Sequence, residues 1–142
     1  MALYALAAGS FVLDRIFKML VLSAGPLGWP GVAEFTLFRN RGIAFSLPLP
    51  DAVFWPLALA ILGLLIWGLF RVRRDPRRAL PPLFALIILG AVSNLLDRLA
   101  FGATIDYFLF FNLSAVNVAD GMIVGGAAAA YWLLRPGTGR TK

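Results

Sequence analysis

The hydrophobic residues of this chain fall into four long runs separated by short polar segments. The runs cover residues 2–22, 52–70, 81–99 and 116–134. A helix of about 20 apolar residues is long enough to cross a bilayer core of ~30 Å. The pattern therefore predicts an all-α membrane protein with four transmembrane helices, folded as a single domain over residues 1–142.

Two of the connecting segments predict extended structure outside the membrane. In residues 34–47, Thr36 and Phe38 stand among apolar neighbours and precede the turn-forming sequence Asn40-Arg41-Gly42. Residues 103–111 are too short and too aromatic for a further span. We expect short strands at the membrane surface from the first segment and an extended or re-entrant hairpin from the second, which together form a small extracytoplasmic β-like element.

The composition agrees with a membrane protein. Hydrophobic residues make up 61% of the chain and charged residues only 14%, and the mean hydropathy is +0.84. The net charge of +6 would suit a nucleic-acid-binding protein, but five arginines are concentrated in residues 71–78, between two apolar runs. That concentration is typical of a cytoplasmic loop, so we expect no nucleic-acid partner.

The same arginines predict the orientation of the chain in the membrane. If the 71–78 loop and the basic tail beginning at Arg135 are cytoplasmic, four spans place both termini in the cytoplasm and residues 23–51 and 100–115 outside. In the first outer segment, Arg39 and Arg41 suit lipid head-group anchoring and substrate contact equally well.

Three aspartates then share one depth. Asp97 and Asp120 lie ~14 residues, and Asp14 ~12 residues, from the inner ends of their helices, which at 1.5 Å per residue is ~18–21 Å from the inner face. Ionisable groups at membrane depth are costly and usually functional. We therefore predict one site in the outer half of the membrane that opens outward.

The chain lacks both cysteine and histidine. It therefore has no disulfide, thiol nucleophile or thiolate metal site, and it lacks the commonest base and metal ligand at neutral pH. Acid–base chemistry falls mainly to carboxylates. Three carboxylates are also compatible with a metal site, but without histidine and in a low-dielectric setting we expect neither a metal nor a cofactor.

Asparagine and aspartate recur at one spacing. Asn94 and Asp97 are three residues apart on the third run, and Asn117 and Asp120 repeat this on the fourth. Facing helices would bring both pairs together, with Asp106 entering from the hairpin. Two carboxylates a few ångströms apart do not both ionise easily, so one keeps a proton. One then activates water while the other protonates or polarises a carbonyl.

The spacing leaves open which two aspartates form this acid–base pair. Arg98 follows Asp97 and is expected to neutralise it and hold it ionised. Neither Asp106 nor Asp120 has a cation within four residues, so each is freer to change the pKa of the other. This difference favours Asp106 with Asp120.

The first run also contains charged residues. Asp14 and Lys18 are four residues apart and share one helix face, so we expect Asp14 to pair with Lys18 or Arg15 and hold helices together. A cleaved signal peptide is the alternative for residues 2–22. The run has no basic segment at its start, however, and the three charges interrupt it.

These motifs together resemble the lipoprotein signal peptidase family, signal peptidase II. The resemblance covers nearly the whole chain and rests on Asp14-Arg-Ile-Phe-Lys18, Asn40-Arg-Gly-Ile-Ala-Phe45, Asn94-Leu-Leu-Asp97-Arg98, Ile105-Asp106-Tyr107 and Asn117-Val-Ala-Asp120. It implies an aspartic endopeptidase of the bacterial inner membrane with its active site toward the outer face. Its substrates would be diacylglyceryl-modified prolipoproteins, cut just before the lipid-bearing cysteine.

The resemblance also implies roles for individual residues. Asp106 and Asp120 would be the catalytic pair. The substrate site would be lined by Asn40, Asn94, Arg98 and Asn117, and the surrounding fold would be supported by Asp97 and Asp14. The expected partners are lipid-modified prolipoproteins and membrane lipids, and we expect a monomer. The chain departs from the family pattern at Ser93, where glycine is usual, and at Tyr107, where phenylalanine is common.

A small proton-coupled transporter or channel subunit is the main alternative, with the aspartates as a proton relay. A relay predicts carboxylates spread through the depth of the membrane. In this chain they cluster toward one side, and the inner half of the spans is almost free of ionisable groups.

Overall fold

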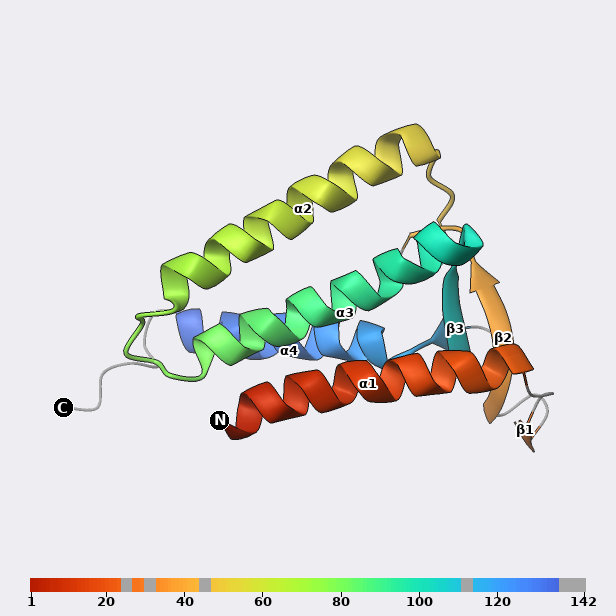
Figure 1. Cartoon of the computed structure of the whole chain (residues 1–142), viewed down its shortest axis with the longest axis horizontal. Coiled ribbons are helices and arrows are strands. Elements are labelled where there is room, and N and C mark those ends of the chain that lie inside the picture. The colour runs from red at the N-terminus through yellow and green to blue at the C-terminus, as the bar shows by residue number, and fades with distance from the viewer. Residues whose placement is uncertain (24–26, 30–32, 44–46, 111–113, 136–142) are drawn as a thin grey trace.

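The protein was analysed as a computed structural model that describes residues 1–23, 27–29, 33–43, 47–110 and 114–135. The chain is mostly helical, with α1 (Ala2–Ser23), α2 (Asp51–Val72), α3 (Leu80–Phe101) and α4 (Val118–Leu134). The described strands β1 (Leu27–Trp29), β2 (Ala33–Asn40), β3 (Thr104–Phe110) and β4 (Ser114–Val116) form one antiparallel sheet in that order. The sheet lies across one end of the helices, and the α2–α3 connection lies at the other end (Figure 1).

The four helices agree with the four apolar runs to within two residues at each end. Pro81 and Pro82 fall in the first turn of α3, where a missing N–H costs nothing. The helix ends at Gly102, its C-cap. Gly102 has a φ of 67°, in the left-handed region, and its N–H donates to the carbonyl of Arg98.

The fourth helix begins two residues after the start of its apolar run at about residue 116. Residues 114–116 form β4, and Asn117 is the N-cap of α4. The Asn117 side chain accepts from the Asp120 N–H at 2.8 Å, and the Asp120 carboxylate accepts from the Asn117 N–H at 3.2 Å. This reciprocal capping box sets the boundary, whereas the run of apolar residues passes across it without a change.

The extended segments around Thr36 and in residues 103–111 are confirmed as β2 and β3. They pair antiparallel, with a register shift between Phe35 and Phe38. The predicted turn after β2 is confirmed as well, because the Asn40 side chain accepts from the Gly42 N–H at 3.0 Å. Residues 44–46 and 111 of the predicted segments lie outside the described residues, as does the basic tail after Arg135.

Among the residues described, two helices, α2 and α3, are long enough and apolar enough to cross a membrane. The apolar helix α4 has 17 residues, and the 22-residue α1 contains the charged Asp14, Arg15 and Lys18. Figure 1 shows α3 between α1 and α2, with α4 beside it, while α2 diverges from the others and has no buried residue.

Small residues let α3 and α4 approach closely, as the sequence between Gly125 and Ala130 predicts. A β-carbon added at Gly126 would lie 2.7 Å from Cγ1 of Ile87, and one added at Gly90 would lie 2.7 Å from the carbonyl oxygen of Ala119. The two helices therefore pack backbone to backbone close to Asp120.

An aromatic cluster fixes the sheet against the end of α1. Phe17 of α1 makes edge contacts with Phe35, Tyr107 and Phe108, at ring-centroid distances of 5.9, 5.6 and 6.0 Å. Val21 and Ile105 complete this buried core. This packing fixes the position of β3, which carries Asp106, relative to α1.

Candidate active site

The carboxylate of Asp106 lies on β3, is almost fully buried and is held by two amides. The side-chain nitrogen of Asn117 donates to Oδ1 at 2.6 Å, and that of Asn40 donates to Oδ2 at 3.2 Å. Each oxygen of Asp106 therefore has one amide donor, from α4 and from β2.

The carboxylate of Asp120 lies in the first turn of α4 and is held in a similar way. The side-chain nitrogen of Asn94 donates to Oδ1 at 2.9 Å, and the backbone N–H of Asn117 donates to Oδ2 at 3.2 Å. In the part of the chain that the structure describes, neither Asp106 nor Asp120 forms an ion pair. The two motifs meet, but the predicted pairs are wrong in detail: Asn94 donates to Asp120 and Asn117 donates to Asp106, while Asp97 lies elsewhere.

Both carboxylates line one cavity of about 680 Å³. Its polar rim also includes Asn40, Asn94 and Arg98, and its walls are apolar surfaces of α2, α3 and α4, among them Phe54, Leu62, Leu95, Ile123 and Val124. The described residues contain no group of three or more acidic, histidine or cysteine side chains placed to hold a metal ion.

Burial, and after it the nearby charge of Asp120, raises the pKa of Asp106 to about 7. The hydrogen bonds from Asn40 and Asn117 act against this increase. A carboxyl group with a pKa near neutrality can hold a proton and release it under the same conditions, which general acid–base catalysis requires.

Asp14 and Asp97 lie outside this cavity, in a buried ion cluster between α1 and α3. The Lys18 ammonium lies 2.8 Å from Asp14 and 2.7 Å from Asp97, and the Arg15 guanidinium lies 2.5 Å from Asp97. The predicted pairing of Asp14 with Lys18 is confirmed. Ser93 joins the cluster by donating to Asp14 at 2.6 Å.

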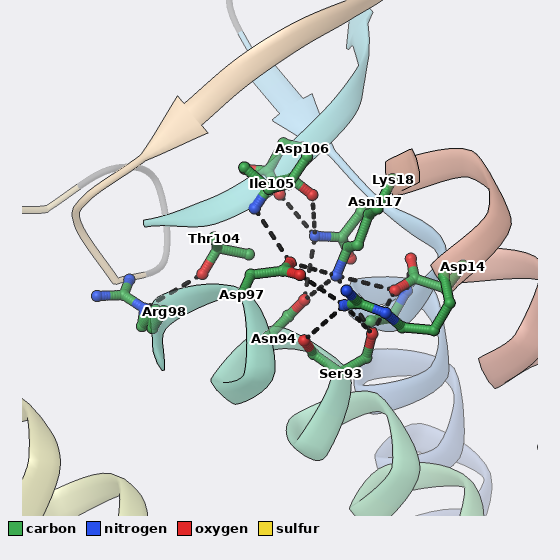
Figure 2. Close-up of polar contacts among 12 residues, drawn as sticks. Asp14, Lys18, Ser93, Asn94, Asp97, Arg98, Thr104, Ile105, Asp106 and Asn117 are labelled. Carbon is green, nitrogen blue, oxygen red and sulfur yellow. Dashed lines mark hydrogen bonds and ion pairs between the residues drawn. The ribbon is translucent and has the colours of Figure 1, made fainter. Parts of the chain in front are cut away.

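The predicted pairing of Asp97 with Arg98 is wrong. Arg98 points away from the ion cluster and donates to the Thr104 hydroxyl at 3.2 Å and to the carbonyl of Gly42 (Figure 2). Its guanidinium also lies over the ring of Phe54, 4.0 Å from the centroid. The reason is helical geometry, because consecutive residues on a helix do not face each other.

The family model for signal peptidase (SPase) II matches residues 6–135. The chain belongs to the signal peptidase II family. Lipoprotein signal peptidases of Aeromonas hydrophila subsp. hydrophila and Azoarcus sp. (strain BH72) are 38% and 36% identical to it, over 87% and 89% of this chain and 81% and 78% of theirs. Membership of this family identifies the chain as a peptidase, which favours the protease interpretation over the transporter.

Two solved structures share the fold. Both are described as bacterial membrane enzymes, determined by the in meso method at 2.3 and 1.9 Å resolution. Each aligns with a TM-score of 0.78, at 18% and 19% identity, over 99% and 96% of this chain and 92% and 94% of theirs. At this identity the likeness shows the arrangement of helices and sheet.

In this member of the signal peptidase II family, sequence reasoning missed how the first turn of α4 is held. The Tyr107 hydroxyl donates to Asp14 at 2.8 Å and accepts from the Val118 N–H at 2.9 Å. Asp14 also accepts from the Ala119 N–H at 3.1 Å. The available signal was the polar residue Ser93 inside an apolar run, together with a tyrosine in an aromatic hairpin.

Proposed function

We propose that this signal peptidase is an aspartic endopeptidase that removes signal peptides from lipid-modified prolipoproteins, with Asp106 and Asp120 as the catalytic pair. The observation that carries the proposal is the placement of both carboxylates on one cavity, each held by amide donors and, among the residues described, by no cation. Two such carboxylates can divide one proton between them.

The pKa of about 7 for Asp106 supports a role for it as the acid. Asp120 then takes a proton from a water molecule, whose oxygen attacks the scissile carbonyl carbon. Asp106 gives its proton to the carbonyl oxygen, which produces a tetrahedral diol. When the diol collapses, the C–N bond breaks, the diol returns a proton to Asp106, and the proton held by Asp120 moves to the leaving nitrogen.

The surrounding polar residues position this pair and the substrate. Asn94 and Asn117 orient the carboxylates. Asn40 reaches Asp106 from β2 and lines the cavity. Arg98 binds the carbonyl oxygens of Arg41 and Gly42, which places the chain after β2 at the cavity rim. Asp14 and Asp97 lie outside the cavity and hold α1 and α3 together through Lys18.

The proposed setting is a bacterial membrane crossed four times by one 142-residue domain, with both termini in the cytoplasm. The arginines of residues 71–78 lie at the end of the helices opposite the sheet (Figure 1), which supports a site near the outer face. The apolar walls of the cavity suit a scissile bond beside a lipid anchor. Since one chain supplies every residue of the proposed site, we propose that a monomer is sufficient.

Cleavage of a defined substrate tests this function. Purified enzyme in detergent is incubated with a diacylglyceryl-modified prolipoprotein and with the same protein lacking the lipid. We expect only the first to shift on a gel, with mass spectrometry locating the cut before the modified cysteine. Equal cleavage of both forms would contradict the proposed substrate.

Matched aspartate variants test the catalytic pair in the same assay. Asparagine keeps the shape of aspartate but does not exchange the required proton, so Asp106→Asn and Asp120→Asn should each lose detectable cleavage while remaining folded. Asp75→Asn is the control, because Asp75 pairs with Arg77 in the loop between α2 and α3. Normal cleavage by Asp106→Asn would show that this pair is wrongly assigned.

A further inference from the structure

The Lys18 ammonium is completely buried and has three close partners. Its nitrogen lies 2.8 Å from Oδ2 of Asp14, 2.7 Å from Oδ2 of Asp97 and 2.9 Å from Oδ1 of Asn94. The Ser93 hydroxyl is a longer contact at 3.4 Å. An ammonium has three N–H donors and no acceptor, so two donors serve the ion cluster and the third serves Asn94.

This third bond is the shorter of two that orient the Asn94 amide, because the Asn117 side-chain nitrogen donates to the same Asn94 oxygen at 3.2 Å. A side-chain amide presents an oxygen on one side and two N–H donors on the other. If the amide turned over, its N–H groups would face the donors of Lys18, and its oxygen would face the carboxylate of Asp120. In the observed orientation, the oxygen accepts from Lys18 and the nitrogen donates to Oδ1 of Asp120 at 2.9 Å.

We propose that Lys18 is a positioning residue for the acid–base pair, because it holds the Asn94 amide with an N–H directed at Asp120. Lys18 is absent from the cavity lining, and its hydrogen bond to Asn94 is the contact through which we expect it to position the pair. Figure 2 shows Asn94 beside Ser93 and Asp97 of the ion cluster. What Asp120 does in the reaction rests on the proposed function.

Arg15 provides a matched control within the same cluster. It lies on the same helix as Lys18, and its guanidinium contacts Asp97 at 2.5 Å and the Ser93 carbonyl at 3.2 Å. Among the described residues its hydrogen bonds go to Ser93 and Asp97, and none reaches Asn94. Its loss should therefore weaken the cluster without freeing the amide.

A double-mutant cycle separates positioning from stability. Lys18→Met and Arg15→Met are made alone and together with Asn94→Ala, and kcat, KM and the melting temperature are measured for each enzyme. Loss of a hydrogen bond that orients a charged group corresponds to a rate about ten- to hundred-fold lower. We expect Lys18→Met to lower kcat by this factor with KM little changed, because Lys18 touches no substrate.

The background variant gives the sharper result. In Asn94→Ala the amide is already gone, so adding Lys18→Met should change kcat by no more than roughly two-fold, while the melting temperature still falls. Arg15→Met should lower the melting temperature but keep kcat within roughly two-fold of wild type in both backgrounds. A structural role alone would reduce kcat equally for both cations.

Loss of one buried cation leaves the cluster with an excess carboxylate, so Lys18→Met alone is at risk of not folding. The comparison is then made in Asp97→Asn, where removing Lys18 restores the balance of charge. The same drop in kcat, relative to Asp97→Asn itself, is expected there.

Two results would overturn the positioning role. One is a kcat for Lys18→Met equal to its reference enzyme. The other is a Lys18→Met effect of the same size with and without Asn94. Failure of the proposed function looks different, because Asp106→Asn and Asp120→Asn would then cleave normally. If both are inactive while Lys18→Met keeps full kcat, only the positioning role is wrong.

Discussion

At the scale of single residues, the chemistry depends on which groups surround each carboxylate. Asp97 and Asp14 face cations within 2.8 Å, and these ion pairs hold them between α1 and α3. Asp106 faces the amides of Asn40 and Asn117 instead. The aspartates of this chain thus differ in their neighbours, and this difference is the basis for proposing Asp106 and Asp120 as the catalytic pair.

The raised pKa of Asp106 predicts how the rate depends on pH. As the acid, Asp106 must be protonated, so kcat should fall as the pH rises through about 7. The profile is measured with the lipidated substrate between pH 5 and pH 9. A rate that stays constant from about pH 6 to 9 would contradict the acid role of Asp106.

The raised pKa of Asp106 also predicts how the stability of the protein changes with pH. The change has the opposite sign to the one that a salt-bridged aspartate causes. An aspartate has a pKa of about 3.9 when unfolded, so the folded protein binds the Asp106 proton more tightly. This contribution is complete below about pH 4 and is lost as the pH rises toward about 7. Asp106→Asn should therefore gain melting temperature relative to wild type between pH 4 and pH 8. If the melting temperatures of Asp106→Asn and wild type change with pH in the same way, this prediction is contradicted.

Asp97→Asn should act on stability rather than chemistry. Its carboxylate pairs with Lys18 and Arg15 and accepts from the Ile105 N–H at 3.2 Å. Breaking a buried pair by removing one partner costs roughly 3–5 kcal/mol. We expect a clearly lower melting temperature in detergent with cleavage surviving in the folded fraction. A stable but inactive Asp97→Asn would instead place Asp97 in the catalytic pair.

At the scale of secondary-structure elements, α3 and α4 are the pair that brings the two Asn-x-x-Asp motifs together. The first turn of α4 has its N–H groups satisfied by Tyr107, Asp14 and Asn117, which come from β3, α1 and the cap itself. These hydrogen bonds to backbone N–H groups fix the Asp120 backbone relative to β3 and α1, whatever conformation its side chain adopts. The position of the carboxylate is therefore a property of the helix junction.

Close packing of these helices gives a matched pair of glycine variants. At Gly90 an added β-carbon would lie 2.7 Å from the carbonyl oxygen of Ala119, next to Asp120, whereas at Gly125 it meets no atom within 4 Å. Overpacking costs roughly 1–3 kcal/mol, so Gly90→Ala should lower both the melting temperature and kcat. Gly125→Ala should change neither, and equal losses in the two variants would contradict the contact.

At the scale of the whole molecule, the two ends of the helices carry different polar groups. The sheet and the proposed catalytic pair lie at one end, and the arginine-rich connection of α2 and α3 at the other (Figure 1). The α2–α3 connection is held to the end of α4, because Arg77 donates to the Leu133 carbonyl at 2.9 Å. Arg77 also pairs with Asp75 within the connection. The proposed catalytic pair and the positive charge of residues 71–78 thus lie at opposite ends of the helices.

The division predicts the orientation in the membrane. Reporter fusions after Arg78 and Arg140 should read cytoplasmic, and a fusion at Gly31 should read extracytoplasmic, because arginine-rich loops remain inside. A phosphatase and a fluorescent-protein reporter at each site give opposite signals and control for expression. An extracytoplasmic signal from the 71–78 loop would contradict the proposed outward-facing site.

Much of the fold follows from local properties of the sequence. The four apolar runs specify helices because an unpaired backbone cannot remain in lipid, and Gly102 and Asn117 mark helix ends by their own conformational and capping preferences. The short strands β1 and β4 were not predicted. Each has three residues and depends on a neighbouring strand for its hydrogen bonds.

The candidate pair Asp106 and Asp120 was also favoured by sequence, since neither has a nearby cation. What decided the partners of Asp97 and the direction of Arg98 was tertiary structure. Arg15 and Asp97 are separated by 82 residues, and no local spacing indicates that they meet. Helix periodicity places residues on a face, but packing decides what that face meets. The third bond of Lys18, to Asn94, exists only because α1 and α3 lie side by side.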